Sequence, residues 1–322
     1  MQGKVTTEEA MPPVYAGIDV CKERLDVYLH PLDQVWSVAN DAAGRRLLLR
    51  RLTKAEVALA VMEPTSKYHR AAHRHLDAGG IAVALVNPLR SRLFAEACGQ
   101  LAKTDAIDAR MLALMAERLQ PEAAAPPSQI EEELQELANA RSAAIADRVA
   151  LANRMETTTL AFLRRELTVR LNSLAHHIER LETRIAALIA SDPATARRAA
   201  ILRSIPGIGP ANVIAILAGL REIGRLSAKQ IAALAGLAPF ARDSGPGQGR
   251  RSIRGGRNEL RRYLYMAAVS ASRCNPDLKC FYQHLIASGK PAKLALTAVA
   301  RKLIVLANTL VAENRAWTPE RP

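Results

Sequence analysis

Four acidic residues lie where a folded chain could bring their carboxylates together. Asp19 interrupts the apolar run YAGID, and Glu63 closes the run LAVME directly before a proline. Asp105 and Asp108 are three residues apart in a helical pattern, so their side chains share one helix face with Cβ atoms about 5–6 Å apart. Carboxylate oxygens are preferred ligands of Mg²⁺, and two such ions about 3.5–4 Å apart stabilise both the attacking and the leaving oxygen of a phosphodiester. The set therefore predicts a metal site for phosphoryl chemistry.

Each of these acids also has an ordinary structural explanation. An Asp at a strand end is usually a turn former, and two acids spaced i,i+3 usually belong to a solvated helix face. A buried strand, however, rarely carries a carboxylate without a partner. The functional interpretation therefore depends on the four residues occurring together.

A second group of residues forms a basic, glycine-rich stretch at 241–262. It contains seven arginines but only Asp243 and Glu259 as acids, and five glycines lie between Ser244 and its end. Arginine makes bidentate contacts to phosphate, and glycine lets a loop follow a nucleic-acid backbone closely. We therefore expect nucleic-acid contacts from the arginines of this stretch, Arg242, Arg250, Arg251, Arg254 and Arg257. The alternative is a flexible, solvated surface loop.

Residues 201–219 place a Pro-Gly-Ile-Gly-Pro turn between two helical segments, a pattern that resembles a helix-hairpin-helix. Gly207 and Gly209 would let backbone N–H groups approach a phosphate, and a helix N-terminus adds a favourable partial charge. A tight turn that packs two core helices has the same pattern. The motif alone does not separate these two interpretations.

The elements that must position the acids are typical of an α/β domain at 12–120. The runs within 14–30 and 35–39 are rich in β-formers and predict a β-meander, and 57–64 and 81–88 predict buried strands. Helical patterns near 41–53 and 67–78 lie between these strands. Thr104 is a plausible N-cap for a helix that carries Asp105 and Asp108 and ends before the proline-rich segment 121–127.

A long helical linker is expected at 128–192, because residues 129–190 contain neither Gly nor Pro. Its apolar residues repeat at alternating spacings of four and three: Leu167, Leu171, Leu174, Ile178, Leu181, Ile185 and Leu188. This coiled-coil seam predicts packing against a second copy, as a dimer or tetramer, or against the chain's own helices. We favour self-association modestly. Asp192-Pro193 ends the helix, and a mostly helical domain is expected at 196–315.

The composition favours a nucleic-acid partner. The 322 residues suffice for two domains, and 45 Lys and Arg against 31 Asp and Glu give a net charge of +14. A ribosome-associated or membrane-surface protein would share this charge. The four cysteines are scattered, without the spacing of a zinc site. No uninterrupted apolar run of 18 residues and no signal-peptide pattern is present, so we expect a cytoplasmic protein without a membrane partner.

Two sets of motifs resemble the DEDD insertion-sequence transposases. GIDVCKERLDVYL, MEPTSKY and KTDAIDAR resemble their N-terminal domain, and GLAPFARDSGPGQGRRSIRGGRNELRRYLYMAA resembles their C-terminal domain. The resemblance covers about 14–118 and 200–312. It implies a RuvC-like, ribonuclease H-like first domain, in which the acidic quartet Asp19, Glu63, Asp105 and Asp108 binds Mg²⁺. It also implies that Ser244 is a nucleophile, and Ser252 fits the family pattern less well.

The resemblance further implies a recombinase of a bacterial mobile element. It would cut and rejoin donor and target DNA through a covalent phosphoserine, guided by a structured non-coding bridge RNA, in association with the nucleoid. The stretch around Ser244 has no histidine, so activation would fall to the metal site, which in the family belongs to the other domain. The alternatives are a hydrolytic RuvC-like Holliday-junction endonuclease, for which Ser244 would be incidental, and a non-enzymatic nucleic-acid scaffold.

Overall fold

A computed structural model describes residues 12–100, 104–240 and 251–319. The chain divides into two compact units, Met1–Pro126 and Pro127–Pro322, with the boundary in the proline-rich segment. Ser244, Arg242 and Arg250 lie outside the described residues.

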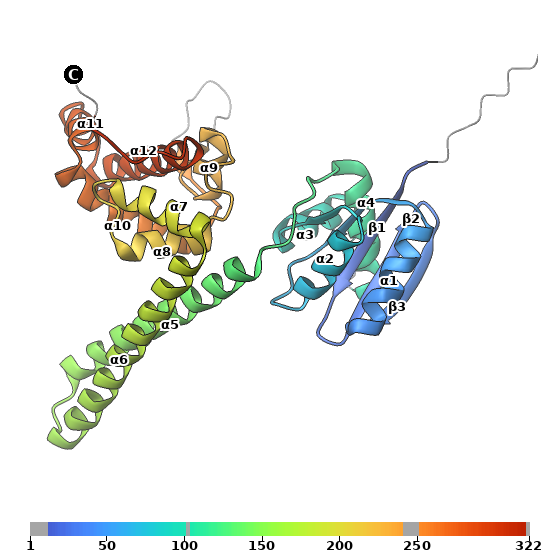
Figure 1. Cartoon of the computed structure of the whole chain (residues 1–322), viewed down its shortest axis with the longest axis horizontal. Helices are drawn as coiled ribbons and strands as arrows, with labels where there is room; N and C mark the ends of the chain where they lie inside the picture. The colour runs from blue at the N-terminus through green and yellow to red at the C-terminus, as the bar shows by residue number, and fades with distance from the viewer. Residues whose placement is uncertain (1–11, 101–103, 241–250, 320–322) are drawn as a thin grey trace, which may run out of the picture. The chain divides into compact units, whose positions relative to one another are not determined.

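The first unit is built on a five-stranded mixed sheet with the order β3-β2-β1-β4-β5 (Figure 1). Its strands are β1 (Val14–Val20), β2 (Arg24–His30), β3 (Gln34–Ala39), β4 (Val57–Met62) and β5 (Val83–Leu85). The first three strands pair antiparallel, whereas β4 runs parallel to both β1 and β5. This mixed α/β arrangement is compatible with the expected ribonuclease H-like fold.

Helices cover both faces of this sheet because side chains alternate along each strand. Ala16 and Ile18 of β1 belong to the core under α1 (Ala42–Lys54) and α2 (His69–Ala78). Tyr15 belongs to the opposite core, under α4 (Asp105–Leu119). The alternation therefore divides β1 between two helical layers and places its odd-numbered residues beneath α4.

One helix of this unit, α3 (Pro88–Ala97), was not predicted from the apolar pattern. Its N-terminus nevertheless carries the standard signals. The Asn87 side chain accepts a hydrogen bond from the Leu89 N–H at 2.8 Å, and Pro88 occupies the first helical turn. The expected strand at 81–88 is correspondingly shorter, because β5 ends at Leu85.

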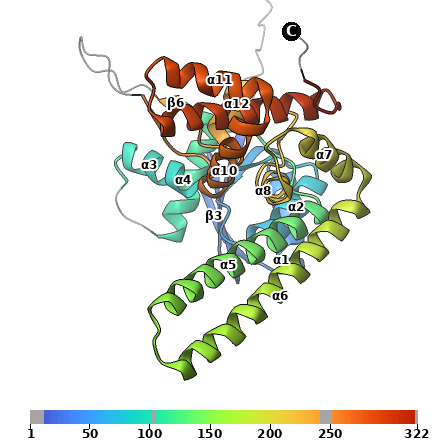
Figure 2. The same ribbon diagram turned by 90° about the vertical axis from the view of Figure 1, so that its left-hand side faces the viewer.

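The linker segment forms two antiparallel helices, so the prediction of one continuous helix is wrong. Figure 2 shows α5 (Gln129–Thr157) and α6 (Ala161–Ser191) lying side by side as a hairpin. The break falls at three consecutive threonines, Thr157–Thr159. The hydroxyls of Thr157 and Thr158 donate to the Arg154 carbonyl at 3.2 and 2.7 Å, which favours local bonds over continuation of the helix.

The leucine-rich seam packs within this hairpin. Ile178, Ile185 and Leu188 are buried, and the other four seam residues are half-buried, in a helix that packs against α5. The alternative in which the helix folds back on its own chain is therefore what the structure shows. The seam is occupied within one chain, and the oligomeric state stays a prediction.

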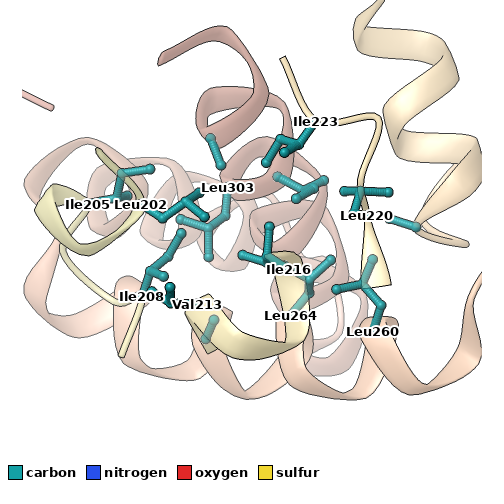
Figure 3. Packing of buried hydrophobic residues seen from close by; sticks show 14 of the residues in the cluster. Leu202, Ile205, Ile208, Val213, Ile216, Leu220, Ile223, Leu260, Leu264 and Leu303 are labelled. Carbon is teal, nitrogen blue, oxygen red and sulfur yellow. The ribbon is translucent and has the colours of Figure 1, made fainter. Parts of the chain in front are cut away.

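The rest of the second unit is mostly helical. Its elements are α7 (Pro193–Ser204), α8 (Pro210–Gly219), α9 (Ala228–Leu234), α10 (Asn258–Cys274), α11 (Pro276–Ala287), α12 (Ala292–Ala312) and the short strands β6 (Pro239–Phe240) and β7 (Ser252–Ile253). Leu202, Ile216, Leu264 and Leu303 bring α7, α8, α10 and α12 into one core (Figure 3).

The helix α12 is long and apolar enough to span a membrane by length and composition. In this fold it is a core helix. Val299, Leu303, Ile304 and Leu310 are buried in the main cluster of the second unit. Its hydropathy therefore reflects burial against α9, α10 and α11.

Candidate functional site

The acidic site begins with the register of the first two strands. Asp19 on β1 lies directly opposite Asp26 on β2. Directly paired residues of an antiparallel ladder project from the same face of the sheet. Both carboxylates therefore lie on the face covered by α4.

Gly17 brings α4 close to this pair. A Cβ atom at Gly17 would lie 1.8 Å from the Ala109 carbonyl oxygen and 2.5 Å from the Ala113 nitrogen. Only glycine allows the helix backbone to rest directly on β1 here. The first turn of α4, which carries Asp105 and Asp108, begins at the expected cap, where the Ile107 N–H donates to Thr104 Oγ1 at 3.3 Å.

The electrostatics of Asp19 show that the acids act on one another. The pKa of Asp19 is raised from 3.8 to about 6, first by burial, then by the charges of Asp108 and Asp105, with a smaller contribution from Glu63. A hydrogen bond from the Val20 N–H at 3.0 Å opposes this shift. Such repulsion disfavours the fully ionised site and is relieved by a bound cation.

The carboxylates of Asp19, Asp26 and Asp105 come closest together. One oxygen from each lies within 4.8 Å of the other two, a spacing that a divalent cation can bridge. Asp108 and Glu63 are not in this tight group. An all-oxygen donor set of this kind fits Mg²⁺, and the residues of the site therefore suit a hard divalent metal.

Glu63 is held by a different contact. It follows β4, and its carboxylate accepts a hydrogen bond from the hydroxyl of Ser91, which is buried on α3. Ser91 was not among the predicted site residues because α3 itself was not predicted. Its hydroxyl restricts the orientation of Glu63.

Asp26 and Arg24 were also missed from the sequence. Arg24 bonds Asp26 through Nε and Asp105 through Nη2, both at 2.7 Å. The argument that singled out Asp19, a carboxylate inside an apolar strand, applies equally to Asp26 in RLDVYLH. That signal was present and could have identified it.

In the second unit, the segments that flank 241–250 form a closed neck. Pro239 pairs with Ile253 and Phe240 with Ser252, so the residues on either side of the segment that contains Ser244 lie side by side. Below them, a Cβ at Gly256 would lie 2.2 Å from the Gly236 nitrogen. The fallback nucleophile, Ser252, is an exposed residue of this ladder.

Two arginines of the basic stretch hold this neck. Arg257 donates to both carboxylate oxygens of Glu222 at 2.8 and 2.7 Å and to the Gly219 carbonyl at 2.7 Å. Arg261 donates to the carbonyls of Gly236 and Gly255 at 3.2 and 3.1 Å. Arg257, which we expected to contact nucleic acid, thus has a structural partner for its guanidinium.

The predicted hairpin between α7 and α8 is present, but its two glycines differ. Gly207 has a φ of +105°, and an added Cβ would lie 2.5 Å from the Ala271 Cβ, so its role is to allow close packing against α10. Around Gly209 the nearest atom to such a Cβ is Asn212 Nδ2 at 4.0 Å. Only Gly209 keeps the open approach that a phosphate contact needs.

Comparison with known proteins identifies the family. A DEDD-type transposase model of the IS110 group matches residues 16–163, and a model for the transposase IS116/IS110/IS902 family matches 199–283. The chain belongs to the DEDD insertion-sequence transposases. The first match covers the unit with the acidic site and continues through α5 of the second unit, and the second match lies within the second unit and ends in α11, past the neck.

Relatives of this DEDD transposase align over most of the chain. Pilin gene-inverting proteins of Moraxella bovis and Moraxella lacunata are each 27% identical over 317 residues, covering 95% of this chain and 98% of theirs. An insertion element IS110 protein of Streptomyces coelicolor is 26% identical over 168 residues, which covers 52% of this chain and 40% of that protein.

Membership in the DEDD transposases gives the acidic site its general chemistry. The family comprises enzymes that recombine or transpose DNA and depend on a divalent metal. This agrees with the carboxylates gathered on the α4 face of the sheet, with Asp19 at their centre.

Proposed function

We propose that this transposase cuts and rejoins DNA strands of a bacterial mobile element, with Ser244 as the nucleophile and Mg²⁺ as the metal. The observation that carries the proposal is the approach of Asp105 on α4 to Asp19 and Asp26 on the sheet, with one carboxylate oxygen of each within 4.8 Å of the other two. Burial, followed by the charges of Asp108 and Asp105, raises the pKa of Asp19 to about 6, in keeping with this clustering. Asp19, Glu63, Asp105 and Asp108 would hold the metal. Bound there, Mg²⁺ would neutralise charge that develops on the reacting phosphate.

Two transesterifications account for cutting and rejoining. In the first, the Ser244 Oγ attacks a DNA phosphate, an Oγ–P bond forms, and the bond to one deoxyribose oxygen breaks. The serine proton passes to a base, and the departing deoxyribose oxygen takes up a proton. In the second, a deoxyribose hydroxyl of another strand attacks the phosphoserine and releases Ser244. The number of phosphate ester bonds is conserved, so no external energy source is required.

The names of two relatives support strand rejoining over hydrolysis. The Moraxella proteins are named for inverting a pilin gene, and inversion of a DNA segment requires that cut ends be joined again. A covalent enzyme–DNA link preserves the ester bond for that step. Hydrolysis by water would lose it.

The neck supports Ser244 over Ser252 as the nucleophile. Ser252 is paired with Phe240 in the β6–β7 ladder, whereas Ser244 belongs to the segment 241–250 that connects the two strands. Arg251 and Arg254 are exposed beside the neck and would contact DNA phosphates near the reacting group. Arg242, Arg250 and Gly209 complete the proposed nucleic-acid surface.

The experiment that tests the nucleophile is capture of a covalent protein–DNA adduct on denaturing gels, followed by peptide mapping. Ser244→Ala should lose both adduct and recombination, and Ser252→Ala should retain the adduct. Asp19→Asn should lose cleavage with DNA binding retained. An adduct peptide without Ser244, or strand joining by Ser244→Ala, would refute the assignment.

We further propose that a structured bridge RNA guides the reaction and that the enzyme works as a dimer or tetramer. The net charge of +14 supports a polyanionic partner beyond a short DNA contact. Leu160, Phe162 and Val169 are exposed at the free end of the α5–α6 hairpin and offer an apolar contact surface. Sequencing of copurified RNA and light scattering with and without nucleic acid test these two points. A monomer under all conditions would exclude the assembly.

A further inference from the structure

Arg24 joins two carboxylates that the chain places far apart in sequence. It opens β2, and its guanidinium bonds Asp26 through Nε at 2.7 Å and Asp105 through Nη2 at 2.7 Å. Arg24 and Asp105 are 81 positions apart. Because Nε and Nη2 belong to one rigid planar group, a single side chain sets the separation between the sheet and the first residue of α4.

Asp26 is the buried anchor of this connection. It is only 8% exposed, and its other carboxylate oxygen accepts a hydrogen bond from Ser37, its cross-strand partner on β3. A buried carboxylate is stable only when its oxygens are hydrogen-bonded or ion-paired. Ser37 and Arg24 supply those contacts from two sides, so the position of the guanidinium is tied to the sheet.

Asp105 is the exposed partner of Arg24. Its side chain is 60% exposed at the first position of α4. An exposed Asp can adopt several rotamers. The contact from Arg24 selects one, and in that arrangement an Asp105 oxygen lies within 4.8 Å of oxygens of Asp19 and Asp26.

We propose that Arg24, anchored by Asp26, is a positioning residue that holds Asp105 in place for metal binding at the acidic site. The proposal rests on the metal-dependent function proposed above and adds two residues outside the quartet. Groups that orient metal ligands typically contribute 10- to 100-fold to metal affinity or activity.

The sign of the effect separates positioning from simple charge. A guanidinium next to carboxylates repels a divalent cation, so its removal would tighten metal binding if charge alone mattered. Loss of positioning would weaken it. The two roles therefore predict opposite changes in the same measurement.

The experiment is Mn²⁺ titration of the full-length protein, with free Mn²⁺ measured by electron paramagnetic resonance. Arg24→Gln and Asp26→Asn should each weaken Mn²⁺ binding about tenfold or more and raise the Mg²⁺ concentration needed for cleavage. Arg24→Lys should lose less, because an ammonium can still bond one of the two carboxylates, but it should not reach wild-type affinity, because it cannot span both. Arg50→Gln, an exposed arginine on α1, should bind like wild type. Asp19→Asn should bind least.

Two outcomes overturn different parts of this account. If Arg24→Gln binds Mn²⁺ as tightly as wild type or more tightly while Asp19→Asn does not, the positioning role is wrong and the metal site stands. If Asp19→Asn also binds normally, the proposed metal site itself fails. Should Arg24→Gln or Asp26→Asn fail to fold by circular dichroism, Arg24→Lys decides the matter, and wild-type Mn²⁺ affinity in that variant refutes the proposal.

Discussion

Asp19→Asn should make the metal-free protein more stable at neutral pH. The pKa of Asp19 is raised to about 6 by burial and by Asp108 and Asp105, against 3.8 without these effects. Between these values the folded state binds more protons than the unfolded state, so stability falls as pH rises. The contribution is fully present below about pH 3.8 and is lost above about pH 6. At pH 7.5 the ionised Asp19 therefore destabilises the fold.

The magnitude follows from the shift. About two pH units correspond to ~3 kcal/mol at 1.36 kcal/mol per unit. Asp19 is only partly buried, and solvent screening reduces this figure to about 1 kcal/mol. Asparagine has nearly the same size and keeps an oxygen for the Val20 N–H. For a domain of this size, the melting temperature should rise by about 4 °C.

The assay is thermal unfolding in EDTA at pH 7.5 and pH 4, with Asp77→Asn, an exposed substitution on α2, as the control. The gain of Asp19→Asn should largely disappear at pH 4, where the folded wild type is protonated at Asp19. Addition of Mg²⁺ should stabilise wild type through binding and leave Asp19→Asn nearly unchanged. A variant that is no more stable than wild type at pH 7.5, or equally stabilised at both pH values, would refute the electrostatic argument.

Three further predictions concern the supports of the two sites. Gly17→Ala should cost about 3 kcal/mol in urea unfolding, because its Cβ meets the backbone of α4. Arg257→Ala should cost about 3 kcal/mol at pH 7, because it leaves the half-buried Glu222 with only the longer, 3.8 Å contact to Arg221. Burial raises the pKa of Glu222, but the hydrogen bonds and charge of Arg257, together with a backbone hydrogen bond and Arg221, lower it overall. The cost should therefore shrink as pH falls below about 4.5, and Glu222→Gln should recover part of it. Arg251→Ala and Arg254→Ala should each reduce the salt dependence of DNA binding, measured by anisotropy, by about 0.7–0.9 in log–log slope; unchanged slopes would place both side chains away from the phosphates.

Most of the first unit could be predicted from local pattern. The strands at 14–30 and 35–39 and the helix capped by Thr104 appear where expected, because alternation and capping are properties of neighbouring residues. Asp105 and Asp108 share a helix face for the same reason. Their approach to Asp19 depends on the close contact between Gly17 and Ala109, which are 92 positions apart in the sequence. No local pattern predicts such a contact.

The missed residues show where pattern analysis ends. Asp26 carries the same local signal as Asp19, but its place beside Asp19 follows from the register that the hairpin between β1 and β2 sets. Ser91 acts through a helix whose apolar periodicity is weak. The seam of α6 was recognised, but periodicity describes one face of a helix and does not say which chain covers it. The threonine hydroxyls that end α5 turn the segment back on itself.

The arginines around the serine loop show why charge in the sequence overestimates contact with nucleic acid. Arg257 and Arg261 belong to the same basic run as Arg251 and Arg254, yet their donors meet Glu222 and backbone carbonyls of the neck. If a guanidinium paired with a half-buried carboxylate moved to bind a phosphate, the carboxylate would lose the partner that compensates its desolvation. Arg257 and Arg261 therefore stabilise the neck on either side of the segment that contains Ser244, and their charges are not free for DNA contacts. The number of phosphate contacts must accordingly come from the salt slopes of single variants, and we expect that number to be smaller than the count of arginines in the loop.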